Sequence, residues 1–104
     1  MAYALVVTTT DSVEAAESLA RSAVDERLAA CAQIVGPVTS VYRWEGEVQT
    51  DREWQVVCKT TGAASERLVE HLRSAHSYDV PEVIVVPITS GNPAYLAWMD
   101  EETT

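Results

Sequence analysis

The sequence is poor in several kinds of residue, and each shortage excludes a class of protein. Its 104 residues include four glycines, one lysine, two cysteines and no phenylalanine. The scattered glycines leave no loop that could cradle a phosphate, and no P-loop, dinucleotide-binding or nucleophile-elbow motif is present. No apolar run approaches the roughly 20 residues of a membrane helix, and no signal-peptide pattern opens the chain. We therefore expect a cytoplasmic protein without membrane partners.

Basic residues are scarce as well. Seven lysines and arginines stand against sixteen acidic residues, which gives a net charge of −9. A nucleic-acid-binding protein normally presents a basic face, so no nucleic-acid partner is expected. The acidity would suit a bound cation, but it also keeps many proteins from associating in solution.

The two cysteines, Cys31 and Cys58, belong to no C-x-x-C motif, which excludes a zinc knuckle or a thioredoxin-like site. A cytosolic pair of this kind is normally reduced. Cys31 lies in the apolar stretch "LAACAQI", and Cys58 alternates in phase with Trp54 and Val56. We therefore expect both thiols to be small, inert core residues rather than nucleophiles.

Hydrophobic residues make up 47% of the chain, which is enough for one folded domain over residues 1–104. Apolar spacing and turn residues predict seven elements. They are a strand over 3–9, a helix from the N-cap Asp11 (with Glu14 in a capping box) to near Leu28, two antiparallel strands within 31–60 joined near Gly46 by a loop that could extend towards Asp51, a helix from Ala64 to Ala75, a strand over 83–88, and a short helix after Asn92 and Pro93.

The predicted order is β-α-β-β-α-β with a terminal helix, which indicates an α+β, ferredoxin-like fold. Its single antiparallel sheet carries both main helices on one face, with the first and third strands central. Proline is tolerated mainly on edge strands or at bulges. Pro37 and Pro87 fall in the second and fourth strands, in agreement with this order.

The central hairpin is too long for one small domain. Each arm can reach ten or more residues, against a usual strand length of about five or six. Tyr42, Trp44 and Trp54 would leave an exposed aromatic patch on an unsupported ribbon. We therefore predict a closed homo-oligomer that covers the hairpin and the edge strands. The alternative is a terminal helix that folds back over these aromatic residues.

Metal binding is the most specific chemistry that the residues suggest. Thiolate, imidazole and carboxylate together suit copper or zinc, and the candidate ligands are Cys31, Cys58, His71, His76, Asp79 and Glu82. A turn forced by Pro81 could bring the last three together. The competing interpretation is structural, because a histidine suits the end of a helix and aspartate is a common turn residue. The spacing alone favours the structural interpretation, because it shows little of the ligand geometry that a metal site requires.

Several blocks of sequence, in order, look familiar. They are "ERLAACAQI", "SVYRWEGEV", "EWQVVCKT", "HSYDVPEVIVVPI" and "GNPAYLAWM". Over nearly its whole length the chain resembles the CutA family of divalent-cation tolerance proteins. The resemblance implies a homotrimer of ferredoxin-like subunits, related in architecture to the PII signalling proteins, with hairpins packed around the threefold axis. It also implies a link to copper and other divalent metals, no obligatory cofactor and no established enzymatic reaction.

The resemblance also assigns residues. Cys31 matches the family's characteristic cysteine of the second strand, and His71 stands where some bacterial relatives have cysteine. An inter-subunit cleft is expected to include Tyr42, Trp44, Glu53, Lys59, His76, Tyr78 and Glu82. Ser77 and Asp79 depart from the family pattern, which has proline and glutamate there.

Three hypotheses follow from these residues. The first is a trimeric metal-tolerance protein that binds a divalent metal weakly, with Cys31, His71, His76, Asp79 and Glu82 as candidate ligands. The second is a PII-like signalling or scaffold module that binds a small ligand between subunits. The third, an enzyme using Lys59 and His76, is not expected, because it would need a perturbed lysine or histidine in a cleft.

Overall fold

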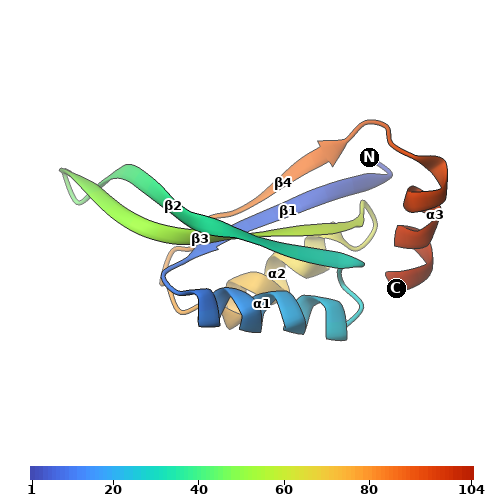
Figure 1. Cartoon of the computed structure of the whole chain (residues 1–104), viewed down its shortest axis with the longest axis horizontal. Coiled ribbons are helices and arrows are strands. Elements are labelled where there is room, and N and C mark those ends of the chain that lie inside the picture. Colours follow the sequence, from blue (N-terminus) through green and yellow to red (C-terminus); the bar gives the residue numbers. More distant parts are fainter.

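The structure, a computed structural model, describes all residues from 1 to 104. Its elements follow the predicted order (Figure 1). They are β1 (Tyr3–Thr10), α1 (Val13–Asp25), β2 (Cys31–Trp44), β3 (Glu47–Thr61), α2 (Ser65–Ala75), β4 (Val83–Ile88) and α3 (Pro93–Glu102). None of the three helices has the length and apolar character needed to span a membrane.

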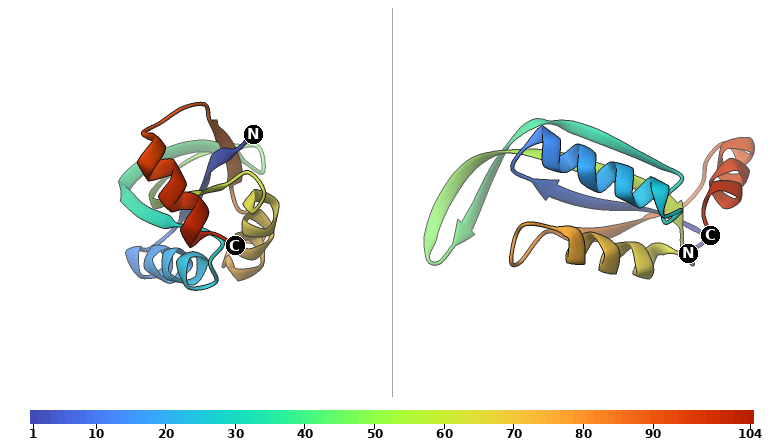
Figure 2. Two further views of the ribbon diagram at one scale, coloured as in Figure 1. Left: turned by 90° about the vertical axis from the view of Figure 1, so that its right-hand side faces the viewer. Right: turned by 90° about the horizontal axis from the view of Figure 1, so that it is seen from below.

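The four strands form one antiparallel sheet in the order β2-β3-β1-β4. The first and third strands are therefore central, and the ferredoxin-like α+β fold is confirmed. α1 and α2 lie side by side against one face of the sheet, and α3 stands across its end (Figure 2). The opposite face of the sheet has no helix over it, and we call it the open face.

Alternation along the strands places the core between the sheet and α1 and α2. Val6, Val56 and Cys58 point to the helices and are fully buried. Leu68 and Leu72, four residues apart on α2, complete the same core from the helix side. The prediction that Cys58 is a core residue is confirmed, whereas Cys31 is only partly buried.

The start and end of α1 differ from the prediction. The N-cap is Ser12 rather than Asp11, because the Ser12 hydroxyl accepts a hydrogen bond from the Ala15 amide at 3.1 Å. The helix ends at Asp25 rather than near Leu28. Arg27 has a φ of 58°, a left-handed conformation that ends the helix. The prediction placed the end of the helix too late because the apolar spacing continues to Leu28. Leu28 packs against the core although it lies beyond the helix.

β2 and β3 form a long hairpin that extends well beyond β1. The last β1 residue, Thr10, pairs with Trp54, so the part of β3 before Trp54 pairs with β2 alone. The chain turns at Glu45 and Gly46, both with positive φ, as in a tight two-residue hairpin. The turn near Gly46 is confirmed. A loop extending to Asp51 is wrong, because Asp51 pairs with Ser40 within the ladder.

An irregularity interrupts β2 at Gly36 and Pro37. Val35 pairs with Gln55 and Val38 with Glu53, so β2 carries one extra residue there, a β-bulge. Pro37 thus lies at a bulge on an edge strand, as expected for proline. Because of the extra residue, Val35 and Val38 share a face of the ladder although they are three positions apart.

The terminal helix lies at the end of the sheet away from the hairpin tip (Figure 1). Asn92 caps it by accepting from the Ala94 amide at 3.1 Å, and Pro93 follows as predicted. The Tyr3 hydroxyl donates to Asp100 at 2.6 Å and ties the helix to β1. The alternative in which this helix covers the hairpin aromatics is therefore wrong, and Trp44 stays 51% exposed.

Candidate functional site

The predicted cleft residues divide between two ends of the sheet. Tyr42, Asp51, Glu53, His76 and Tyr78 gather where the hairpin leaves the body, and we call them the hairpin-base cluster. Cys31, Lys59, Tyr95 and Trp98 lie at the α3 end, and we call them the α3-end cluster. In β1, Leu5 pairs with Lys59, whereas Thr9 accepts from His76. Four residues separate these levels, about 13 Å at ~3.3 Å per residue.

His76 fastens the loop after α2 to the end of β1. Its Nε2 lies 2.7 Å from the Thr9 carbonyl oxygen, which can only accept, so Nε2 carries the proton. Its Nδ1 accepts from the backbone amide of Tyr78 at 3.0 Å. Both ring nitrogens are therefore occupied. In this conformation the neutral imidazole has no lone pair left for a metal ion.

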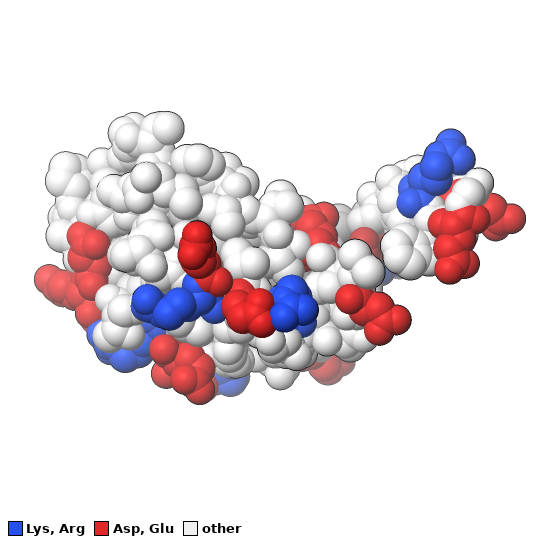
Figure 3. Space-filling model, turned by 180° about the vertical axis from the view of Figure 1, so that it is seen from behind, with Lys and Arg blue, Asp and Glu red and all other residues white.

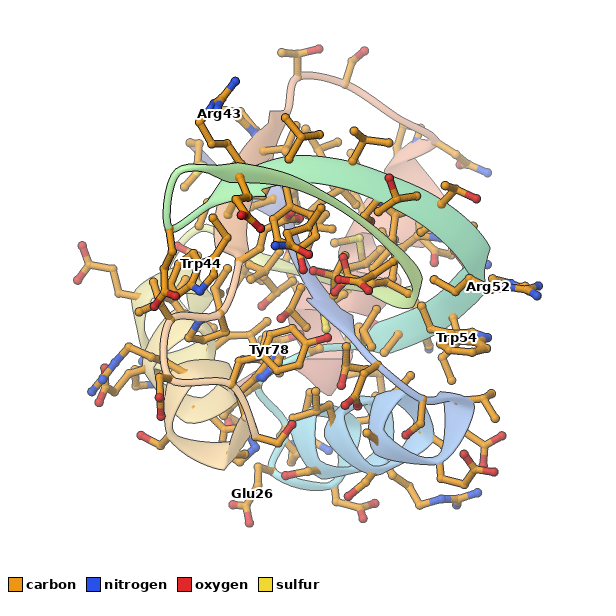
Figure 4. All side chains as sticks on the ribbon, turned by 90° about the vertical axis from the view of Figure 1, so that its left-hand side faces the viewer. Glu26, Arg43, Trp44, Arg52, Trp54 and Tyr78 are labelled. Atoms are coloured by element: carbon orange, nitrogen blue, oxygen red, sulfur yellow. The ribbon has the colours of Figure 1, made fainter.

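Tyr78 extends the same connection to the hairpin. Its hydroxyl donates to Oε2 of Glu53 at 2.9 Å, and its ring lies 4.7 Å from that of His76. Burial raises the pKa of Tyr78 well above its usual value, and the adjacent Glu53 carboxylate raises it further. The phenol thus stays protonated and keeps donating to Glu53, which is only 9% exposed. Figure 4 shows Tyr78 between the hairpin and the helices.

The outer part of the hairpin-base cluster is exposed. The Tyr42 hydroxyl donates to Oδ2 of Asp51 on the neighbouring strand, two residues beyond Gln49, the residue that pairs with Tyr42. This hydrogen bond raises the pKa of Tyr42 above its usual value. Trp44, next to the turn, makes no such bond, and half of its side chain is exposed. Asp51 was not among the predicted site residues, although its place two residues before Glu53 on one strand puts both side chains on the same face.

The two carboxylates of the loop between α2 and β4 do not join this cluster. Asp79 and Glu82 are exposed and form no hydrogen bond or ion pair. No three histidine, cysteine, aspartate or glutamate side chains come together in a way that could hold a metal ion. One subunit therefore does not supply a closed site from the predicted ligands.

The α3-end cluster surrounds the partly buried Cys31. Cys31 pairs across the ladder with Lys59, whose Nζ lies 5.6 Å from the centre of the Tyr95 ring. Tyr95 in turn packs at 5.3 Å against Trp98. Burial raises the pKa of the Cys58 thiol to about 12, with Cys31 adding to the effect. Cys58 is therefore a protonated core thiol, and Cys31 is the cysteine that a soft metal could reach.

His71 lies elsewhere, on the helix layer. Its Nε2 is 2.6 Å from the Ser22 hydroxyl, so it joins α2 to α1. This places it on the opposite side of the sheet from the α3-end cluster. The three predicted ligands Cys31, His71 and His76 thus belong to three separate surroundings in one subunit.

A further feature escaped prediction although the sequence displays it. No charged residue occurs between Glu82 and Asp100, in a chain of which 22% is charged. The segment contains β4 and most of α3. Seen from behind in Figure 3, charged side chains gather along the helices, at the hairpin tip and at the lower left, where α3 ends, while the upper left of the surface, over β4 and the start of α3, is uncharged. The long gap between charged residues, rather than any motif, was the feature of the sequence that could have predicted this uncharged surface.

Comparisons with known proteins agree on one family. The family model described as CutA1 divalent ion tolerance protein matches residues 4–102. The divalent-cation tolerance protein CutA of Thermus thermophilus is 46% identical over 99 residues, covering 95% of this chain and 96% of that protein. The chloroplastic protein CutA of Arabidopsis thaliana is 48% identical over 99 residues.

This chain spans about half the length of the Arabidopsis relative: the alignment covers 95% of the chain but 54% of that protein. Among solved structures, CutA1 of Oryza sativa superimposes with a TM-score of 0.96 at 44% identity, covering 100% of this chain and 95% of the other. The likeness therefore extends over the hairpin and α3 as well as the body.

Proposed function

Because the chain belongs to the CutA1 divalent ion tolerance protein family, we propose that it acts in the response to divalent metal ions as a cytosolic homotrimer. The family match over residues 4–102 carries this proposal. The metal component is weak binding of copper or another divalent cation. The cytosolic component is supported by the two free cysteines, as expected in a reducing compartment.

The open face of the sheet supports self-association. Leu5, Val7 and Val57 lie on it half-buried, while Ile84 and Val86 are 50% and 40% exposed. A continuous apolar sheet face of this kind is unfavourable in water. It adjoins the uncharged segment between Glu82 and Asp100, so an interface there would bury no unpaired charge from that segment.

The hairpin and the sheet edges support a closed ring of subunits rather than a dimer in which two open faces meet. β2 and β4 are the two edges of the sheet, and each has unpaired backbone groups on its outer side. Both faces of the hairpin carry exposed apolar side chains, namely those of Val41, Trp44 and Val48. A heterologous contact repeated around a threefold axis would cover an edge and a hairpin in every subunit.

The metal component needs more than one subunit. A single chain holds no group of three suitable side chains, and both nitrogens of His76 are engaged. The residues of one chain therefore do not fit a closed copper site. Cys31 is the accessible soft donor. It lies on the edge strand β2, opposite Lys59 of β3, and a neighbouring subunit at this edge would add further donors.

We propose binding rather than catalysis. An enzyme built on Lys59 and His76 would need both groups at one reacting centre. They lie at opposite ends of the sheet in one subunit, about 13 Å apart along β1 at ~3.3 Å per residue. His76, with both nitrogens bonded, also has no free position for proton transfer.

A second candidate is a PII-like module that binds a small ligand between subunits. The hairpin-base cluster favours it, because Tyr42, Glu53 and Tyr78 offer hydroxyl and carboxylate groups at the root of the hairpin. Such groups recognise a polar organic ligand without metal coordination.

Two measurements test the proposal. Light scattering of the full chain at micromolar concentration is expected to give the mass of three chains of 11.4 kDa, and a monomer mass would contradict the trimer. Calorimetric titration of the metal-free protein with Cu²⁺ and with Zn²⁺ is expected to show saturable binding. If the wild type shows no saturation, the metal component is wrong while the trimer is unaffected.

Variants locate the metal. Cys31→Ser is expected to weaken copper binding by at least about tenfold, since a thiolate is the softest donor on the accessible surface. Cys58→Ala is the matched control, because the Cys58 thiol is completely buried in the core and a metal ion in solution does not reach it. Equal losses in both variants would contradict a role for Cys31. A metabolite that raises the melting temperature in the absence of any metal effect would favour the second candidate.

A further inference from the structure

The charged side chains of the open face are divided between its two ends. Because side chains alternate along a strand, the odd-numbered residues of β3 share this face with Val57. Four of them are charged, namely Glu47, Asp51, Glu53 and Lys59. Their pairing partners on β1 and β2, and the β4 residues beyond, are all uncharged. The three carboxylates thus lie on the hairpin side of the face, and Lys59 lies at the α3 end (Figure 1).

Lys59 is the only basic residue on the open face. Arg43 pairs with Val48 and Arg52 with Thr39, so both arginines point to the opposite side of the hairpin. The other four arginines belong to α1, to α2 or to the segment directly after α1. The open face therefore has one positive group at one end and an acidic group of residues at the other.

Glu53 is buried without a positive charge beside it. Its Oε2 accepts from the Tyr78 hydroxyl at 2.9 Å, which is a neutral donor, and its Oε1 has no hydrogen-bond partner in the chain. Neither of the two ion pairs of the chain includes Glu53 or the adjacent Asp51. A carboxylate that is only 9% exposed is normally paired with a cation, because its burial costs free energy otherwise.

Lys59 does not reach this carboxylate within one subunit. Six residues separate Lys59 from Glu53 along β3, about 20 Å at ~3.3 Å per residue, which is more than the two side chains span together. The Lys59 Nζ instead lies 5.6 Å from the centre of the Tyr95 ring and forms no ion pair. The positive and the negative end of the face thus both lack a counterpart in their own chain.

A second copy of the chain supplies what each end lacks. The middle of the face is apolar at Leu5, Val7 and Val57, so two copies that meet there would bury it from water. Complementary charges favour contact between the Lys59 end of one copy and the acidic end of the next, whereas two acidic ends would repel. A contact between two different patches is heterologous, and its repetition can close a ring.

We propose that Lys59 of each subunit pairs with the Glu53 and Asp51 carboxylates of the next subunit. The pairing rests on the homotrimer of the proposed function and adds which ends of the open face meet. The hairpin-base cluster is then complete only when the neighbouring subunit contributes its ammonium group. Lysine suits this role because its flexible four-carbon stem carries a compact charge across an interface.

Zero-length cross-linking tests the pairing directly, because Lys59 is the only lysine of the chain. A water-soluble carbodiimide activates a carboxylate, and the Lys59 Nζ displaces the activated group to form an amide, while one carboxylate oxygen leaves in the urea. Digestion and mass spectrometry are expected to find Lys59 joined to Glu53 or Asp51. Labelled and unlabelled chains refolded together are expected to give mixed-label products, which identify bonds between subunits.

Charge reversal provides an independent test. Lys59→Glu is expected to weaken association at least about thirtyfold, because it places a third carboxylate against two others. Asp51→Lys, at an exposed position, is expected to weaken it as well. The double variant exchanges the two charges and is expected to recover most of the lost affinity. Light scattering across a dilution series, in mild urea where the wild type begins to dissociate, measures all three.

Two controls separate the pairing from net charge. Arg52→Glu makes the same change in charge on the same strand but on the opposite face, and it is expected to keep wild-type association. Glu66→Lys, on the exposed side of α2, restores the net charge of the Lys59→Glu protein without restoring the pair. It is expected to give no recovery.

The outcomes separate the pairing from the trimer itself. A wild-type trimer in which Lys59 forms no cross-link to Asp51 or Glu53 would overturn the pairing and leave the proposed function intact. Equal weakening by Lys59→Glu and Arg52→Glu would also overturn it, as would a double variant no better than Lys59→Glu alone. A monomer mass for the wild type would overturn the pairing and the trimer together.

Discussion

Val56 and Val57 are neighbours on β3, yet they have opposite surroundings. Val56 faces the helices and is completely buried, whereas Val57 faces the open side and is only partly covered. The same contrast runs through β1, where Val6 is buried and the adjacent Val7 is not. Alternation of side chains across a strand makes every central strand of this sheet serve two layers at once.

The two faces differ in what completes them. The covered face finds its partners, α1 and α2, in the same chain. The open face is just as apolar at Leu5, Val7 and Val57 but has no helix to cover it. A sheet buried on both sides has near-continuous hydrophobic strands, and β1 reads in that way. The apolar pattern of β1 therefore supports the proposed self-association through the open face.

The largest expected effect concerns the covered face. Leu68→Ala removes a side chain that is fully buried between α2 and the sheet. It is expected to lower the free energy of unfolding by about 2–5 kcal/mol, through lost burial and the cavity left behind. Denaturant unfolding at fixed protein concentration measures this. A loss below 1 kcal/mol, roughly what a surface change costs, would contradict the position of the core.

The next effect concerns the open face. Val86→Asp places a charge on the apolar surface, where an interface would leave it unpaired. Association is expected to weaken at least about a hundredfold, which light scattering across a dilution series would detect. Val24→Asp is the matched control, because Val24 is 39% exposed on the helix layer and Val86 is 40% exposed on the open face. If both variants keep the wild-type mass, the open face is not the interface.

The smallest effect concerns the boundary between body and hairpin. Tyr78→Phe leaves the buried carboxylate of Glu53 without its donor and is expected to cost about 1–3 kcal/mol. Tyr42→Phe removes a similar bond to Asp51, but an exposed one, and is expected to change stability much less. Thermal unfolding of the two variants side by side makes the comparison. A larger loss of stability in the Tyr42 variant would contradict the view that the buried Tyr78 bond contributes more than the exposed Tyr42 bond.

The pH dependence of this bond follows from the raised pKa of Tyr78. A phenol whose pKa is higher in the folded chain stabilises it fully below the ordinary value of 10.0. The contribution is lost as the pH rises through the folded-state pKa. The difference between wild type and Tyr78→Phe should therefore be constant from neutral pH to about 10 and shrink only above it. A difference that disappears near neutral pH would contradict the bond.

Most of the fold was predictable because it depends on local patterns. Alternation at Trp54, Val56 and Cys58 identified a strand, and the placement of Pro37 and Pro87 agreed with the edge positions of the second and fourth strands. The N-cap was missed by one residue because Asp11 and Ser12 are both good caps. Only the geometry of the first turn decides that the Ser12 hydroxyl reaches the Ala15 amide.

The candidate site was predictable as a list of residues but not as an arrangement. His76 is held by a carbonyl that is 67 residues away in the chain, which no local spacing could reveal. The same contact removes the free nitrogen that a metal ligand would need. The two ends of the sheet, separated by strand length, likewise divide residues that the resemblance grouped in one cleft. That grouping stays a prediction about neighbouring subunits.

The bulge at Gly36 and Pro37 makes the hairpin behave as a lever. The arm beyond it, from Val38 to Trp44, is about 23 Å long at ~3.3 Å per residue, so a bend of about 10° at the bulge moves the tip by about 4 Å. A methyl group at Gly36 would lie 2.6 Å from Cδ1 of Trp54. Any larger residue there must displace the indole or bend β2 at the bulge, and such a bend would move Trp44 further than the residues next to the bulge. A substitution at Gly36 is therefore expected to move the tip of the hairpin most, in the region that would contact the next subunit of the proposed trimer.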